Sequence, residues 1–192
     1  MGKVVHEVSM SLDGFITGPN IRPEAGLGDG GERLHEWAFD EADPHTSAIV
    51  ESFANFGATI VGRTTYDLSI RYWGANGPLG ATRLPTIIVS HNVPSDVPEG
   101  GVYSFVNGVE AAFAKAKALA GAKDISSSGS DVASQALALG LIDEIAIHVV
   151  PVLLGSGTPL FGKVDLKHVK LEPLETIQAK DVIHLRFSVI RQ

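Results

Sequence analysis

The sequence predicts one α/β domain with a mixed sheet, mostly parallel, that ends in a C-terminal antiparallel hairpin. Three observations lead to this prediction. Strand-like and helix-like segments alternate through the middle of the chain, as in sheets whose parallel strands are joined by helices. Residues 182–190 alternate apolar and polar side chains, which is typical of an antiparallel strand with one buried face. A length of 192 residues, 44% of them apolar, suits a single domain over 1–192.

The N-terminal half is predicted to hold two strands, three helices and one long loop. In order, we expect a strand over 3–10, an exit turn over 11–16, a loop over 18–31, helices over 32–39 and 46–56, a strand over 58–62 and a helix over 66–73. The loop is rich in Gly, Pro, Asn and Asp, and loops of this length in compact domains are usually functional or disordered. The second helix carries its apolar residues on one face and is expected to pack on the core.

The C-terminal half continues the alternation and then ends in the hairpin. In order, we expect a strand over 85–90, a helix starting at Asn107 and ending at Gly121, a strand over 124–126, a helix over 131–139, a strand over 144–152 and hairpin strands over 168–177 and 182–190. Asn107 and Glu110 have the spacing of a capping box, so Asn107 is predicted to cap the helix. In the last strand, Ile183 and its alternate neighbours are predicted to face the core and His184 the solvent.

Composition excludes several classes of function. The formal charge is −7 and no run of Lys or Arg offsets it, so nucleic acid is not an expected partner. The absence of cysteine excludes disulfides, thiolate metal sites and a cysteine nucleophile. No apolar run approaches the roughly 20 residues of a membrane span, and no signal segment precedes the first strand. We therefore expect a cytoplasmic protein.

Some local motifs match known binding sites only in part. The segment from Gly157 to Lys163 matches a phosphate-binding loop, but Val164 stands where magnesium needs a hydroxyl and no helical pattern follows. The histidines never show the spacing of a helical metal site, and core or surface roles are expected for His6, His148 and His184. No metal is predicted.

The stretch from Gly62 to Thr65 predicts an anion site. It follows a β-branched strand and opens an amphipathic helix, so free backbone N–H groups and the guanidinium of Arg63 meet at one point. Two further turns, Ser90-His91-Asn92 and Ser127–Ser130, also follow predicted strands. In open α/β sheets ligands bind at the carboxyl ends of the strands, so these three turns are expected to form one phosphate-binding edge.

Three motifs follow one another along the chain. They are Ser9-Met-Ser-Leu-Asp-Gly-Phe-Ile16, Gly62-Arg-Thr-Thr-Tyr66 and the run Gly140-Leu-Ile-Asp-Glu144 through Pro151-Val-Leu-Leu-Gly155 to Phe161, which is the most specific. With these motifs the chain resembles the dihydrofolate reductase superfamily, and within it the C-terminal reductase domain of RibD. The resemblance covers nearly the whole chain. The resemblance implies a three-layer α-β-α fold with a mixed sheet of about eight strands, NADPH along the strand ends and a homodimer.

The same resemblance assigns roles to individual residues. The cofactor-binding set is Ile16, Gly62, Arg63, Thr64, Thr65, Ser90, His91, Ser128, Gly129 and Ser130. Within it, Ser90 and His91 would lie near the adenosine 2′-phosphate, and the last three residues at the pyrophosphate. Many relatives have Gly-Gly at Ser128-Gly129. The riboflavin-pathway reductases often have Lys where Phe15 stands, and the loss of this cation weakens the case for a phosphorylated sugar substrate.

The catalytic candidates are Asp13, Glu36 and Trp37. Asp13 borders the expected nicotinamide site, although capping of its own turn is the simpler role. Trp37 either lines the substrate pocket or packs in the core. Glu36, Asp40 and Asp43 all remain candidates for the carboxylate that serves proton delivery in dihydrofolate reductases.

The predicted function is hydride transfer from NADPH to a C=N or C=O bond of a small heterocyclic or sugar-derived substrate, as in 5-amino-6-(5-phosphoribosylamino)uracil reductase. Two alternatives remain open. One is dihydrofolate reduction, and the other is a nucleotide-binding module that has lost catalysis.

Overall fold

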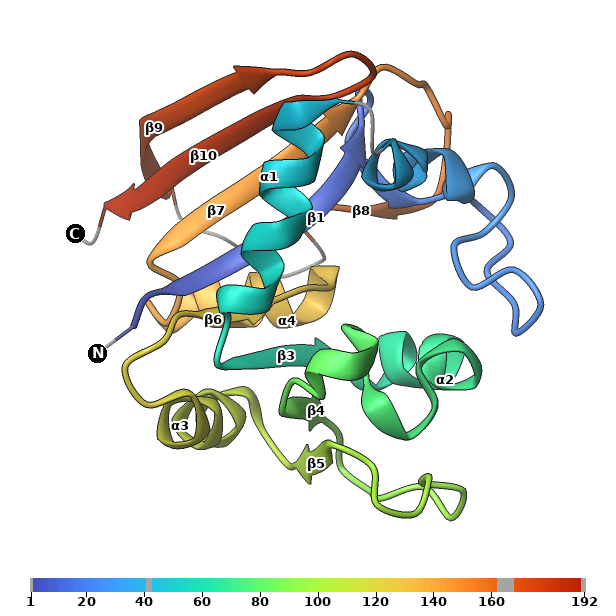
Figure 1. Ribbon diagram of the computed structural model, residues 1–192, viewed down its shortest axis with the longest axis vertical. Coiled ribbons are helices and arrows are strands. Elements are labelled where there is room, and N and C mark those ends of the chain that lie inside the picture. The colour runs from blue at the N-terminus through green and yellow to red at the C-terminus, as the bar shows by residue number, and fades with distance from the viewer. Residues whose placement is uncertain (1, 41–42, 162–167, 191–192) are drawn as a thin grey trace.

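An eight-stranded sheet forms the centre of the computed structural model, which describes residues 2–40, 43–161 and 168–190 (Figure 1). The strand order is β5-β4-β3-β6-β1-β7-β10-β9. The first six strands run parallel to their neighbours, whereas β10 is antiparallel to both β7 and β9. The predicted mixed sheet with a closing hairpin is therefore confirmed.

The elements alternate along the chain as the sequence predicts. The strands of the main sheet are β1 (Val4–Ser11), β3 (Ala58–Gly62), β4 (Thr86–Val89), β5 (Tyr103–Val106), β6 (Ile125–Ser127), β7 (Glu144–Val150), β9 (Lys170–Gln178) and β10 (Ile183–Ile190). The α-helices are α1 (Pro44–Ser52), α2 (Arg63–Trp73), α3 (Val109–Ala120) and α4 (Ser130–Ala138). Within the described residues, none of the helices is long and apolar enough to span a membrane.

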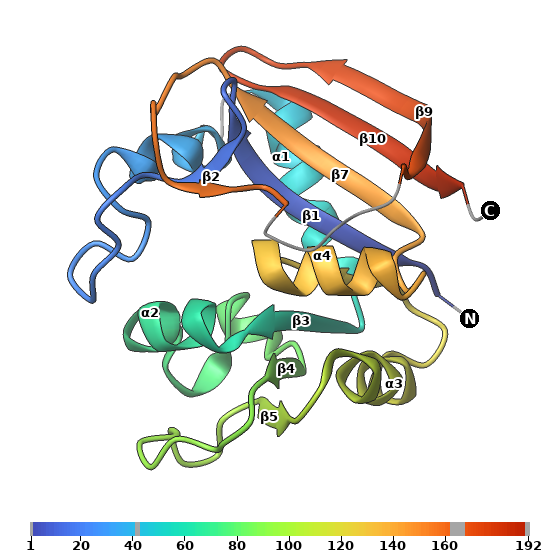
Figure 2. The ribbon, with the colours of Figure 1, turned by 180° about the vertical axis from the view of Figure 1, so that it is seen from behind.

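Helices cover both faces of the sheet and give three layers. α1 lies across one face in Figure 1, and α4 lies in front of the opposite face in Figure 2. Alternation along β3 explains the arrangement, because Ile60 packs with Phe113 of α3 while the next residue, Val61, packs with Tyr66 of α2. A separate apolar cluster beneath α1 contains Leu34 and Trp37.

Three short strands were not predicted from the sequence. β2 (Phe15–Thr17) and β8 (Thr158–Pro159) pair as a small second sheet, and β5 extends the main sheet beside β4. Strands of two to four residues carry too little alternation to be recognised. β8 replaces the apparent phosphate-binding loop, whose residues 162–164 lie outside the described residues.

The predicted cap of α3 is wrong. Gly108, with a φ of 94°, is the N-cap residue, and no side chain caps the helix. The side-chain oxygen of Asn107 instead lies 2.9 Å from Nδ1 of His91. A tertiary contact at the strand ends has therefore replaced the local one.

Two predictions about local conformation also need correction. Residues 32–39 form not one α-helix but two 3₁₀ turns, Gly31–Leu34 and Glu36–Phe39. At the start of β10 the expected faces are reversed, because His184 is 5% exposed and Ile183 is 43% exposed. His184 faces α1, which buries it, whereas Ile183 lies on the less covered side of the sheet.

The edge strand β9 is irregular and exposed. All of its residues except Ile177 are exposed, including Leu171 and Leu174. Its pairing with β10 shifts register so that Phe187 stands opposite Pro173 while the preceding Arg186 stands opposite Glu175. Leu174 is thus the extra residue of a β-bulge.

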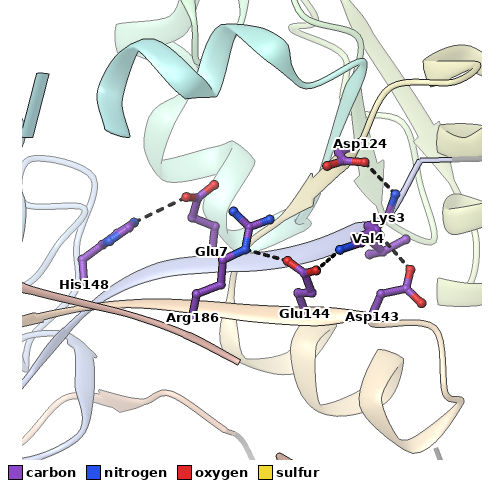
Figure 3. A network of polar contacts seen from close by, with 8 residues as sticks. All are labelled: Lys3, Val4, Glu7, Asp124, Asp143, Glu144, His148 and Arg186. Atoms are coloured by element: carbon purple, nitrogen blue, oxygen red, sulfur yellow. Dashed lines mark hydrogen bonds and ion pairs between the residues drawn. The ribbon is translucent and has the colours of Figure 1, made fainter. Parts of the chain in front are cut away.

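Glu144 ties together three strands near the amino end of β1 (Figure 3). Its carboxylate, only 4% exposed, accepts hydrogen bonds from the Lys3 ammonium and, at 2.6 Å, from Nε of Arg186. Burial opposes ionisation, but these two bonds hold the pKa of Glu144 below its ordinary value. The network therefore contributes stability at neutral pH.

Replacing Glu144 with Gln is expected to lower the free energy of unfolding by about 2 kcal/mol at pH 7, because two cations lose their buried partner. The value lies below that of a fully buried pair because Lys3 and Arg186 are partly exposed. Urea unfolding measures it, with the exposed Glu110→Gln as the matched control that should change stability by less than about 0.5 kcal/mol. The Glu144 contribution should also vanish as the pH falls through its lowered pKa. Equal stability of both variants would contradict the assignment.

Candidate functional site

The predicted binding turns come together at one edge of the sheet. β4, β3, β6 and β1 are consecutive parallel neighbours, so their carboxyl ends lie in a row. Ser90 follows β4, Gly62 ends β3, Ser128 follows β6 and Asp13 follows β1. The backbone topology therefore places residues from four distant parts of the sequence along the edge where α/β proteins bind ligands.

Arg63 reaches from the start of α2 to the end of β4. Its Nε donates to Asp67 at 2.7 Å, and its Nη1 donates to Ser90 Oγ at 3.4 Å and to the carbonyl oxygen of Asn92 at 3.3 Å. Arg63 and Ser90, both in the predicted cofactor-binding set, are thus neighbours. The guanidinium is held by three weak or exposed contacts and remains 36% exposed, so it is available to an anion.

Two helix N-termini lie beside each other next to this guanidinium. Gly62 caps α2 and Gly129 caps α4, in both cases without a side-chain hydrogen bond. A Cβ added to Gly129 would lie 3.5 Å from Oγ1 of Thr65, so the two helix starts are in contact. The first N–H groups of both helices are uncapped by side chains, and two adjoining helix starts favour an anion with more than one charged oxygen.

Ser130 adds an unsatisfied donor to this region. Its hydroxyl lies in the first turn of α4, is buried, and has no hydrogen-bond partner among the described residues. A buried hydroxyl without a partner costs free energy unless a ligand or water satisfies it. The N-terminus of α4 therefore combines uncapped backbone N–H groups with a buried hydroxyl donor.

The remaining predicted cofactor residues lie around these turns. Ile16 is buried in β2, Thr64 is exposed, and Thr65 and Ser128 are half-buried. His91 is exposed and engages Asn107. Their individual contacts with a cofactor remain predictions.

The carboxylate of Asp13 is engaged in hydrogen bonds within the protein. It accepts hydrogen bonds from Ser11 Oγ at 2.6 Å, from the Gly155 N–H at 2.7 Å and from the Leu154 N–H at 3.2 Å. These bonds, the one from Ser11 first, lower the pKa of Asp13. Asp13 thus joins the exit of β1 to the loop after β7, and a proton-transfer role stays a prediction.

Glu36 and Trp37 are adjacent in sequence but lie in opposite environments. Glu36 is exposed. Trp37 is 5% exposed, belongs to the apolar cluster beneath α1 and donates through Nε1 to Ser9 Oγ at 3.0 Å. This placement agrees with the core role of Trp37 that the sequence left open beside the pocket role.

Sequence reasoning missed the polar character of the sheet beneath α1. Glu7, Ser9, His148, His184 and Arg186 all lie on that face, and His148 points toward Glu7 in Figure 3. The signal was present, because Glu7, Ser9 and Ser11 lie on one face of β1 and all three are polar. No group of three or more ligating side chains within the described residues could hold a metal ion.

Known structures share the fold. A protein from Shewanella sp. PV-4 described as a putative riboflavin biosynthesis protein is 24% identical with a TM-score of 0.71, covering 100% of both chains. The deaminase/5-amino-6-(5-phosphoribosylamino)uracil reductase of Thermotoga maritima is 12% identical with a TM-score of 0.66, covering 98% of this chain and 57% of that one. Dihydrofolate reductase from Enterococcus faecalis, complexed with NADP(H), is 15% identical with a TM-score of 0.61, covering 98% and 96%.

Comparison with family models identifies the family of the chain, whereas these structures show its fold. No curated protein sequence matches it significantly. The model of the RibD C-terminal domain matches residues 2–185, which is nearly the entire length. The mixed sheet, the strand-end turns and this match agree with one another, and the chain belongs to the RibD C-terminal domain family.

Proposed function

We propose that this protein is an NADPH-dependent reductase that transfers a hydride to a C=N or C=O bond of a small heterocyclic substrate. Membership of the RibD C-terminal domain family makes it an oxidoreductase with a dihydrofolate reductase-like fold. The observation that carries the cofactor proposal is the pair of uncapped helix N-termini at Gly62 and Gly129, with the Arg63 guanidinium beside them.

The donor groups fit a dinucleotide with an additional phosphate. The adjoining starts of α2 and α4, with Ser130, would hold the pyrophosphate. Arg63 and Ser90 lie on the β4 side of these helix starts and would hold the 2′-phosphate. When bound, NADPH would supply the hydride. The chain itself would orient the cofactor and, through β2 and the Asp13-anchored loop, shape the site beside β1.

The substrate we propose is the ribosylamino-pyrimidine of riboflavin biosynthesis, since the Thermotoga maritima relative is named as its reductase. Dihydrofolate is the second candidate because the Enterococcus faecalis structure shares the fold. The exposed Glu36 would have to face a pterin for that activity. We also propose a homodimer in the cytoplasm, and sedimentation velocity tests the oligomeric state.

Titration with NADPH and NADP tests the cofactor proposal, and NADPH oxidation with the ribosylamino-pyrimidine and with dihydrofolate tests the reaction. Saturable binding below millimolar concentration and turnover of one substrate are expected. Absence of binding at millimolar concentration would refute the cofactor assignment. Tight binding without turnover of either substrate would support the inactive nucleotide-binding module instead.

Two buried serines of α4 provide a matched pair for the pyrophosphate site. Ser130→Ala is expected to weaken NADPH binding about tenfold, the effect of losing one hydrogen bond to a charged group, without lowering the free energy of unfolding. Ser134→Ala removes a hydroxyl that donates to the Ser130 carbonyl oxygen, and it should lower stability by about 1 kcal/mol but leave binding unchanged. Calorimetric titration and urea unfolding measure both quantities. Unchanged binding in the Ser130 variant would place the pyrophosphate elsewhere.

A further inference from the structure

Two buried histidines form a hydrogen-bonded pair on the sheet beneath α1. His148 of β7 and His184 of β10 stand directly opposite each other in the antiparallel ladder, and their Nδ1 atoms are 2.8 Å apart. The two residues are 4% and 5% exposed. Only one of two facing nitrogen atoms can carry the proton of such a bond, so the pair is stable only when it is not fully protonated.

The surroundings determine which nitrogen carries the proton. Nε2 of His148 lies 3.5 Å from Oε1 of Glu7 (Figure 3), so a proton on that nitrogen faces a carboxylate. His148 Nδ1 is then the acceptor, and His184 Nδ1 is the donor. Neither Nε2 makes a hydrogen bond among the described residues. His184 Nε2 is left as a buried acceptor, whereas the N–H of His148 Nε2 keeps the Glu7 carboxylate as an electrostatic partner. The opposite assignment would direct a lone pair at Glu7 and bury an unpaired N–H, which costs more.

Trp37 rests on both rings. Its ring centroid lies 4.7 Å from that of His148 and 4.9 Å from that of His184. Its Nε1 donates to Ser9, so the indole is held between β1 and the histidine pair. Trp37 is also the residue that buries the second 3₁₀ turn, which leads from the loop after β2 toward α1. The histidine pair is therefore one of the supports of the segment Gly31–Phe39, together with the buried Leu34.

A small cavity gives the pair access to protons. It measures about 60 Å³, which is enough for a few water molecules. Its polar lining consists of Glu7, Ser52, His148, Glu175, His184 and Arg186. The other titratable groups near the pair are His35, between the two 3₁₀ turns, and Asp43 and His45 at the start of α1.

We propose that Glu7, His148 and His184 form a pH-sensitive switch that holds Trp37 and the segment Gly31–Phe39 on the sheet while the pair is neutral and releases them when it takes up protons. A first proton on His184 Nε2 creates a buried imidazolium for which Asp43 is a nearby counter-charge, while Glu7 lies beside His148. A second proton, on His148 Nδ1, places two N–H groups face to face at 2.8 Å, so the rings must separate. The cavity gives them room to do so.

The environment keeps His184 neutral at pH 7. Burial, together with the neighbouring His148, lowers the pKa of His184 to about 4. Proton uptake by the folded protein is therefore expected in acid, below the pH at which an exposed histidine titrates. This inference goes beyond the proposed reductase function and does not depend on a bound nucleotide.

Trp37 fluorescence tests the switch in the full chain. Trp73→Phe leaves Trp37 as the sole tryptophan, and a protonated imidazole quenches an adjacent indole. A loss of Trp37 emission is expected around pH 4, where the folded protein protonates His184, and at a higher pH than the loss of far-UV circular dichroism. His184→Phe should abolish this early loss. His6→Asn, which changes a buried histidine on the other face of the sheet, should preserve it.

Imidazole nitrogen NMR of the unmodified protein provides a test that needs no variant. At pH 7 it should show His148 protonated on Nε2 and His184 on Nδ1. The opposite tautomers would overturn the proposal. So would emission that falls only together with circular dichroism, or an early loss that persists in the His184→Phe variant.

Discussion

Replacing Arg63 with Ala is expected to weaken NADPH binding about 30-fold, which corresponds to about 2 kcal/mol for a charge-assisted contact with a phosphate. NADH binding should change by less than about threefold. The reason lies in where the guanidinium points. It contacts Ser90 Oγ and the Asn92 carbonyl oxygen at the end of β4, on the side of Gly62 that is away from α4 and the proposed pyrophosphate site. Only NADPH has a 2′-phosphate to place there.

Calorimetric titration of both nucleotides measures this selectivity. Arg71→Ala is the matched control, since Arg71 lies on the same helix, is exposed and contacts Tyr72 instead of the strand ends. That control should bind both nucleotides like the unmodified protein. An equal loss for NADPH and NADH would move Arg63 to the pyrophosphate, and no loss for either would remove it from the site.

Lowering the pH from 7 to 4 is expected to remove about 3 kcal/mol of stability through His6 alone. Burial in the middle of β1 lowers the pKa of His6 to about 4, against 6.5 when exposed. The unfolded chain therefore takes up a proton that the folded chain refuses. The contribution of His6 to the free energy of unfolding is complete above pH 6.5. It falls as the pH decreases from 6.5 to 4 and is constant below that range. His184 should contribute in the same direction.

Urea unfolding at pH 7 and pH 5 in two variants separates the contribution of His6. His6→Asn keeps a polar group near Ser127, whose Oγ lies 3.2 Å from His6 Nδ1, and should reduce the pH dependence by about 2 kcal/mol over this interval. His91→Asn changes an exposed histidine and should leave that dependence intact. If both variants retained the full change in the free energy of unfolding between pH 7 and pH 5, other groups would account for the acid sensitivity.

Long periodic elements made the fold predictable. Helix α3 and the closing hairpin were recognisable from helical or alternating patterns, and Gly121 ended its helix as expected. The strand β3 was recognisable from its run of apolar and β-branched residues. The short strands β2, β5 and β8 did not, because their pairing depends on chain segments far away in sequence. The same physical limit explains the error at Asn107. Its capping-box spacing is a local signal, and the contact with His91 outweighed it.

The clustering of the strand-end turns was predictable for a similar reason. Glycine turns after buried strands are local signals, and the parallel topology then brings Gly62, Ser90 and Gly129 together. The environment beneath α1 was not predictable. Whether Trp37 lines a pocket or packs in the core depends on β7 and β10, whose His148 and His184 are more than a hundred residues away.

The bulge and the proline of β9 have a consequence for the behaviour of the protein in solution. An exposed edge strand is a template on which foreign strands can add, and this one displays Leu171 and Leu174. Pro173 lacks an N–H to offer such a strand, and the extra residue Leu174 interrupts the regular spacing of the remaining donors and acceptors. Uninterrupted pairing along this edge is limited to a few residues on either side. The irregularity thus protects the open edge against uncontrolled extension of the sheet.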